Sequence, residues 1–261
     1  MTLFETHEER KIQTFSLDER LHPEEVIFVI FLLNETLDKI KEGFASITYF
    51  NEVPLAQMRE LVDSSINPMV EIPGAMHHLS SIQQSDHYTF NHSMGVAVIT
   101  GVFAKWAGYQ CERLKDAILA GLLHDIGKIG VPEAIINKPD RLTDEEYDKI
   151  KQHTVIGSDI LSLVAEFPEL TVGARAHHER FDGRGYPDGL AGEAIPVYAR
   201  IIAVADSYDA MTSKRSYRDV LPQNVVRAEI AKGRGSQFDP QFADVMIQII
   251  DEDQEYMLHE H

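Results

Sequence analysis

Apolar residues recur at helical spacing along most of the chain, and the alternating pattern of strands is sparse. Short breaks separate the apolar segments from residue 91 onward. The segment 180–195 holds four glycines in sixteen residues, which predicts an irregular loop. The pattern therefore indicates an all-α protein. We predict helices over 91–107, 112–126, 143–150, 152–165, 169–179, 197–212, 222–233 and 239–250.

In the first 85 residues the sequence pattern predicts fewer helices. Proline and two glutamates at 23–25 are typical of a helix start. We expect this helix to continue to about Lys41, with Gly43 as its C-terminal cap, although β-branched residues in 26–30 leave a strand open as an alternative. Apolar residues at helical spacing predict another helix over 55–66. We place a boundary near residue 85, between a small helical region of unknown role at 1–85 and a larger helical domain at 86–261.

The longest apolar run, from Val26 to Leu33, has eight residues. A bilayer crossing needs about 20, so no membrane segment is expected. The run could pack on the larger domain or form the face of a homodimer. The start of the chain lacks the basic residues of a signal peptide. The chain has one cysteine, Cys111, so it cannot form an intrachain disulfide. We therefore expect a cytoplasmic protein.

The formal net charge of −18 argues against a protein that coats nucleic acid or anionic membranes by bulk charge. The acidic excess lies at the two ends of the chain. Residues 1–91 carry 15 acidic and 6 basic residues, and residues 236–261 carry 7 acidic and no basic ones. Residues 92–235 hold 20 acidic and 18 basic residues, so the middle of the chain is close to neutral. The acidic ends are expected mainly to aid solubility; the alternative is that the middle is kept positive enough to receive a small anion.

Several histidines and aspartates in this middle region stand among apolar or small residues. Burial of such groups without partners is costly, and divalent ions would supply the missing charge. Nitrogen and oxygen ligands without thiolates suit one or two first-row ions such as Fe, Mn, Ni or Zn, and a carboxylate such as Asp125 can bridge two of them. The candidate ligands are His92, His124, Asp125, His153, His177, His178 and Asp206.

Three segments resemble signatures of one family. They read HDIGKIGVP at 124–132, HHERFDGRGYP at 177–187 and ADSYDAMT at 205–212. Together they resemble the HD-GYP family of cyclic-dinucleotide phosphodiesterases, within the HD superfamily of metal-dependent phosphohydrolases. The resemblance covers roughly residues 85–250 and implies an HD-domain-like helical bundle. It also implies that a metal-bridging hydroxide opens a 3′,5′-cyclic dinucleotide, most commonly cyclic di-GMP, to pGpG or GMP in bacterial signalling.

The resemblance also assigns ligands to two divalent ions, with Fe or Mn favoured over Ni or Zn. Some family members carry a glutamate four residues before the first ligand histidine and hold three ions. Tyr88 occupies that position here, so we expect two. The ligands of one ion would be His92, His124, Asp125 and Asp206. Those of the other would be His153, His177 and His178, with Asp125 as the bridge.

Substrate contacts follow from the same resemblance. Lys128 matches a phosphate-contacting lysine that takes part in catalysis, and Arg215 with Arg218 matches positions that contact substrate. Arg184 and Tyr186 belong to the glycine-rich loop, where Tyr186 can contact a purine. In the family this loop is also associated with protein partners, so a signalling protein is an expected partner.

Three other readings remain open at this stage. The substrate could be 3′,3′-cyclic GMP-AMP, because one hydrogen bond can decide base preference. The chain could instead be a cyclic-dinucleotide sensor or scaffold with little turnover. A di-iron oxygenase of the same superfamily is the third reading, against which Lys128, the two arginines and the GYP loop argue.

Overall fold

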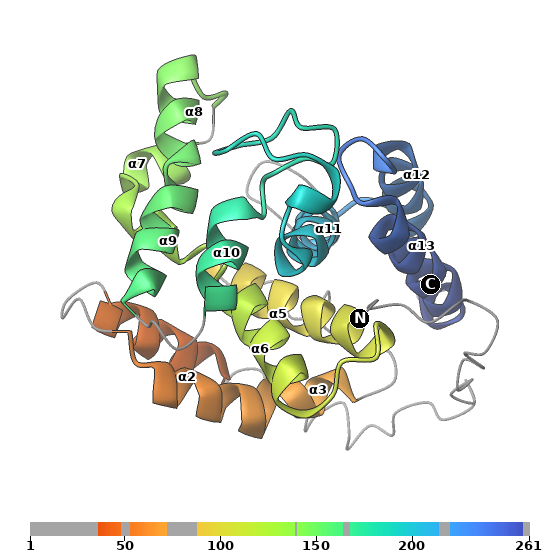
Figure 1. Cartoon of the computed structure of the whole chain (residues 1–261), viewed down its shortest axis with the longest axis horizontal. Helices are drawn as coiled ribbons and strands as arrows, with labels where there is room; N and C mark the ends of the chain where they lie inside the picture. The colour runs from red at the N-terminus through yellow and green to blue at the C-terminus, as the bar shows by residue number, and fades with distance from the viewer. Residues whose placement is uncertain are drawn as a thin grey trace.

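The computed structural model describes residues 36–47, 53–71, 88–138, 140–163, 168–213 and 220–257. Within these ranges the chain is helical throughout, apart from turns, loops and an isolated bridge between Arg234 and Phe238 (Figure 1). The all-α prediction is therefore confirmed. Residues 36–47 form a helix. The α-helices that follow are α2 (Leu55–Leu61), α3 (Asn67–Val70), α5 (Tyr88–Trp106), α6 (Cys111–Leu123), α7 (Glu133–Ile136), α8 (Asp144–Lys151), α9 (His153–Ser162), α10 (Pro168–Ala176), α11 (Val197–Thr212), α12 (Gln223–Gly233) and α13 (Pro240–Met257).

Helices α5 and α6 pack along each other at the centre of the molecule. Helix α11 packs against both of them, and α10 packs against α6 and α11. Figure 1 shows α7, α8 and α9 on one side of this centre and α12 and α13 on the other. Three short turns complete the order: a π-helical turn, η1 (Val62–Ile66), and two 3-10 turns, η2 (Ile126–Gly130) and η3 (Gly192–Ala194). The centre of the bundle thus brings together helices from distant parts of the sequence.

The N-terminal helices contribute to the same hydrophobic core as the rest of the described chain. Ile40, Met58 and Ile66 are fully buried in a cluster that also contains the core residues of α5, α6 and α11. Burial of each such side chain contributes about 1.5–3 kcal/mol to folding. The expected boundary near residue 85 and the apolar run 26–33 both lie outside the described residues.

The helix at residues 36–47 corrects one expectation. We expected Gly43 to end a helix, but the helix passes through this residue and continues for another turn. A side chain at position 43 would overlap with the end of Met58. Gly43 therefore serves close packing between two helices and is not a cap, which local sequence does not reveal.

The helix predicted over 112–126 ends earlier, at Leu123. The backbone of Asp125 leaves the helical region, with φ −99° and ψ 9°, and η2 begins at the next residue. The tighter turn brings the amide of Lys128 to the carbonyl of Asp125 at 2.9 Å. The other helices predicted from residue 91 onward begin within three residues of their predicted starts, but α13 continues to Met257, past its predicted end at residue 250. The segment 180–195 is a loop with only the short η3 in it.

Candidate metal centre

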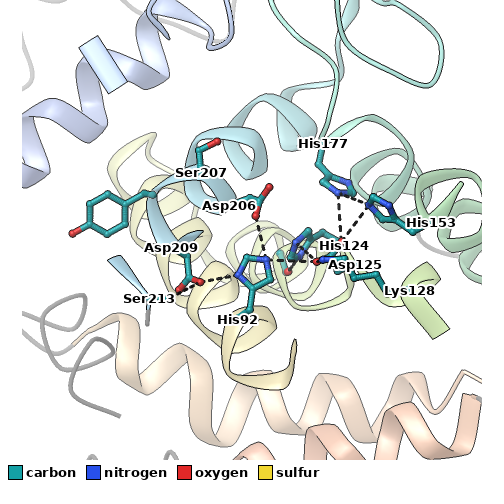
Figure 2. Close-up of polar contacts among 12 residues, drawn as sticks. His92, His124, Asp125, Lys128, His153, His177, Asp206, Ser207, Asp209 and Ser213 are labelled. Atoms are coloured by element: carbon teal, nitrogen blue, oxygen red, sulfur yellow. Dashed lines mark hydrogen bonds and ion pairs between the residues drawn. The ribbon is translucent and has the colours of Figure 1, made fainter. Parts of the chain in front are cut away.

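The seven candidate ligands come from five places in the bundle. Among the described residues, two groups place nitrogen and oxygen atoms within 4.8 Å of one another. Asp125 belongs to both groups (Figure 2). Asp206 on α11 joins the first group through His92, since its Oδ1 lies 3.1 Å from Nε2 of that ring. The first group is His92, His124 and Asp125, and the second is Asp125, His153, His177 and His178.

Three of the histidine rings are oriented by backbone carbonyls three residues earlier. Nδ1 of His124 donates to Gly121 at 2.7 Å, Nδ1 of His153 to Ile150 at 2.6 Å, and Nδ1 of His177 to Ala174 at 2.8 Å. Carbonyls in the last turn of a helix lack partners within the helix, which is why they are available. Because a carbonyl only accepts, each Nδ1 carries the proton. Each Nε2 is therefore left as a lone-pair donor at the centre of the site.

His92 on α5 is oriented differently. Its Nδ1 contacts Oδ2 of Asp209 at 2.7 Å, across 117 positions of sequence. Ser213 donates its hydroxyl to the same oxygen at 2.9 Å. Asp209 was not among the residues predicted for the site, although it lies in the 205–212 motif. Its position one helical turn after Asp206 was the available signal.

The atoms at the centre of the site fit divalent cations. Nε2 of His124 and Oδ1 of Asp125 are buried and make no hydrogen bond. Nε2 of His153 lies 3.2 Å from Nε2 of His177, so two lone pairs face each other when both protons are on Nδ1. A cation between such atoms would remove the repulsion and satisfy the carboxylate. Nitrogen and oxygen donors without thiolates match the first-row ions expected from the sequence.

The protonation states at neutral pH also suit metal binding. Burial lowers the pKa of His178 to about 4, and it lowers the pKa of His153 and of His177 as well. Burial opposes the charge on Asp125, but the ammonium of Lys128 is the largest opposing influence, and the pKa of Asp125 lies well below its ordinary value. Near pH 7 the site thus offers neutral imidazoles and an ionised carboxylate, so few protons compete with a metal ion.

These shifts predict how the metal-free protein responds to acid. Between about pH 6.5 and pH 4 the unfolded chain binds protons on His178 that the folded chain does not, so stability falls as the pH falls. We expect the free energy of unfolding to drop by about 1–3 kcal/mol from pH 7 to pH 5. Urea unfolding of the protein at pH 7 and at pH 5, in the presence of a chelator, measures this change in the free energy of unfolding. His178→Asn should show a smaller drop, and equal drops in both proteins would contradict the assignment.

Two of the predicted substrate residues lie beside the metal groups. Nζ of Lys128 forms an ion pair with Oδ2 of Asp125. The ring of Tyr186 lies 4.9 Å from the ring of His178 at an interplanar angle of 31°. Tyr147 on α8, which the sequence did not single out, meets the ring of Tyr186 edge-on at 6.5 Å. The aromatic rings thus form one surface next to the second metal group.

The other predicted substrate residues are not placed at the site. The side chain of Arg184 is exposed on the loop, and its backbone amide donates to Asp182 at 3.1 Å. Arg215 and Arg218 lie outside the described residues, as does the side chain of Tyr88. The assignments of these four residues remain predictions.

Glu179 holds the glycine-rich loop against the site. This buried carboxylate accepts hydrogen bonds from the backbone amides of Asp188 at 2.7 Å and Gly189 at 3.0 Å. A side chain at Gly185 would overlap with the backbone at 178–180, so the chain can pass there only as glycine. The amide of Tyr186 then reaches the carbonyl of His178 at 3.3 Å. The 177–187 motif by itself predicts no role for Glu179, and these hydrogen bonds to the loop backbone give it one.

Among the helices that the structure describes, none combines the length and the hydrophobicity that a bilayer crossing requires.

Comparison with known proteins places this site in a family. The model of the HD domain family matches residues 75–242. A Pseudomonas aeruginosa protein named cyclic di-GMP phosphodiesterase PA4108 is 35% identical over 219 residues, which cover 84% of this chain and 53% of that protein. The cyclic di-GMP phosphodiesterase response regulator RpfG of Xanthomonas campestris is 41% identical over 152 residues, covering 57% of this chain and 40% of the relative.

A third relative carries a different substrate in its name. The 3′3′-cGAMP-specific phosphodiesterase 1 of Vibrio cholerae is 38% identical over 177 residues, covering 66% of this chain and 40% of the relative. The chain thus spans about half, or less, of the length of these relatives.

The fold agrees with a solved structure. Bd1817, an HDG"Y"P protein from Bdellovibrio bacteriovorus, superimposes with a TM-score of 0.71 at 16% identity, over 90% of this chain and 75% of that one. This likeness confirms the HD-domain-like bundle that the resemblance implied. Since the family model covers more than half of the sequence, the chain belongs to the HD domain family.

Proposed function

We propose that this protein is a metal-dependent phosphodiesterase that opens a 3′,5′-cyclic dinucleotide, with cyclic di-GMP as the leading substrate. The observation that carries the proposal is Asp125, a buried carboxylate shared by two groups of histidines and paired with Lys128. A shared carboxylate suits two neighbouring ions, and a lysine beside it suits a phosphate. Several relatives are named cyclic di-GMP phosphodiesterases, which supports the same substrate class.

Two divalent ions, Fe or Mn in the first instance and Ni or Zn as alternatives, would be held by the two groups. One would take His92, His124, Asp125 and Asp206, and the other His153, His177, His178 and Asp125. When bound, such ions lower the pKa of a water molecule into the neutral range and neutralise charge on a phosphate.

The chain's own residues would orient the substrate around this centre. Lys128 places a cation next to Asp125, where it can donate to a nonbridging phosphate oxygen. Tyr186, packed against His178, presents an aromatic surface to which a purine can stack. Arg184, Arg215 and Arg218 would supply the cations for the second phosphate. We also propose that the protein acts in the cytoplasm, that the loop at 180–187 can meet a signalling protein, and that two copies can form a homodimer.

Turnover assays with two substrates test the proposal. Protein loaded with Mn(II) or Fe(II) is expected to convert cyclic di-GMP to linear pGpG or to GMP, as measured by chromatography of the nucleotides. 3′,3′-cyclic GMP-AMP is the second candidate, because a relative with that specificity is as similar as the cyclic di-GMP enzymes. A side-by-side comparison of kcat/KM decides between them. If the loaded protein leaves both intact yet binds one, it is a sensor or scaffold and the proposed hydrolysis is wrong.

A further inference from the structure

Four histidines of the site have an Nδ1 atom within hydrogen-bonding distance of another group, and these groups are not all of the same kind. The Nδ1 atoms of His124, His153 and His177 contact backbone carbonyls, whereas Nδ1 of His92 contacts the carboxylate of Asp209. A carboxylate carries a full negative charge and a carbonyl only a partial one, so the hydrogen bond to Asp209 is the stronger. Such a partner raises the basicity of the opposite ring nitrogen and so strengthens its bond to a metal.

The surroundings of Asp209 hold its carboxylate in this position. The residue is 1% exposed, and Ser213 donates to the same oxygen that His92 contacts. On α5, a methyl group at Gly95 would overlap with Oδ1 of Asp209. The absence of a side chain at Gly95, three residues after His92, therefore makes room for the carboxylate. Figure 2 shows the carboxylate of Asp209 beside the ring of His92. A buried charge is retained at such a place only when it is well partnered.

The charges around the two metal groups differ as a result. The first group has Asp125 and the neighbouring Asp206, with Asp209 behind His92. The second group combines three imidazoles with Asp125 alone. We propose that Asp209 is a positioning residue that strengthens metal binding in the first group selectively, so that the two metal positions differ in affinity. This inference rests on the metal centre of the proposed function and is independent of the substrate.

Titration with Mn(II) alone tests the inference on the full chain. Metal-stripped protein is titrated, and the free ion is followed by its electron paramagnetic resonance signal. Wild-type protein is expected to bind two ions. Asp209→Asn keeps the shape and an acceptor for His92 but removes the charge, so affinity at one position should fall about 10–100-fold while the other stays unchanged. Gly95→Ala should weaken the same position, because its methyl group displaces the carboxylate without altering either partner.

Asp239→Asn is the matched control. Asp239 is also a buried carboxylate, but it pairs with Arg200 at 2.5 Å and caps α13 away from the metal groups. This variant should melt at a lower temperature and bind Mn(II) as the wild type does. Should Asp209→Asn not fold, Ser213→Ala removes a single hydrogen bond and should give a smaller loss at the same position.

Three outcomes would overturn the inference. Retention of both affinities in Asp209→Asn, an equal loss at both positions, or a change no larger than in Asp239→Asn would each show that Asp209 has no selective role. Wild-type protein that binds no Mn(II), Fe(II) or Zn(II) would remove the metal centre itself, and with it the proposed function. The two failures are therefore distinguishable in the same titration.

Discussion

Asp125→Asn is expected to abolish the proposed phosphodiesterase activity. The substitution preserves the size of the side chain but removes the charge that both metal groups share. Loss of the ions would remove several kcal/mol of charge stabilisation in the transition state, and turnover should fall at least about a thousandfold. His124→Ala should act in the same direction through the first group. The measurement is turnover of cyclic di-GMP together with the number of Mn(II) ions bound per chain, which we expect to fall in parallel.

A second aspartate on the same stretch of chain provides the control. Asp116 on α6 pairs with Arg59 at 3.0 Å and contacts no metal group. Asp116→Asn should therefore keep near-normal turnover and both ions. If Asp125→Asn still binds two ions and turns over cyclic di-GMP at the wild-type rate, Asp125 is required neither for metal binding nor for catalysis.

Lys128→Met is expected to lower turnover without weakening metal binding. Methionine keeps much of the apolar stem of lysine and removes the cation that pairs with Asp125. If Lys128 stabilises charge on the phosphate, kcat/KM should fall about 100- to 1,000-fold. Mn(II) affinity should hold or rise, because no ammonium then competes for the carboxylate. This pattern differs from that of Asp125→Asn, in which both properties are lost.

Lys151→Met is the matched control for this charge. Lys151 lies on α8, pairs with Asp148 at 2.5 Å and lies over the ring of Tyr147. Its loss should leave kcat/KM within a few-fold of the wild type. Full activity in Lys128→Met would show that the lysine only balances the charge of Asp125, and reduced metal binding in that variant would assign it a structural role.

Much of the fold could be predicted because its signals are local. Helices α11 and α12 begin and end within one residue of prediction, since prolines and loop residues mark their ends in the sequence. The types of residue at the metal groups were also readable, because buried histidines and aspartates are uncommon and fit one kind of chemistry. Helix α6 was predicted three residues too long, because the turn at Asp125 depends on its neighbours in space.

Other features depend on contacts between distant segments. Gly43 looked like a helix cap from its neighbours, yet Met58 decides its role. Nothing near Tyr147 in the sequence reveals that its ring meets Tyr186. Glu179 and Asp209 lie within recognisable motifs, but only the backbone amides and the ring that they contact give them a function.

The sequence by itself determined an all-α protein, the kinds of atom available to bind metal, and the resemblance that points to a cyclic dinucleotide. These follow from periodicity, residue chemistry and motif spacing, which are properties of short segments. The tertiary structure decided which atoms meet: Asp125 lies between two groups of histidines, and Asp209 reaches His92 across 117 positions. Pairwise distances between remote segments depend on how the helices pack, so these contacts cannot be derived from the sequence of either segment alone.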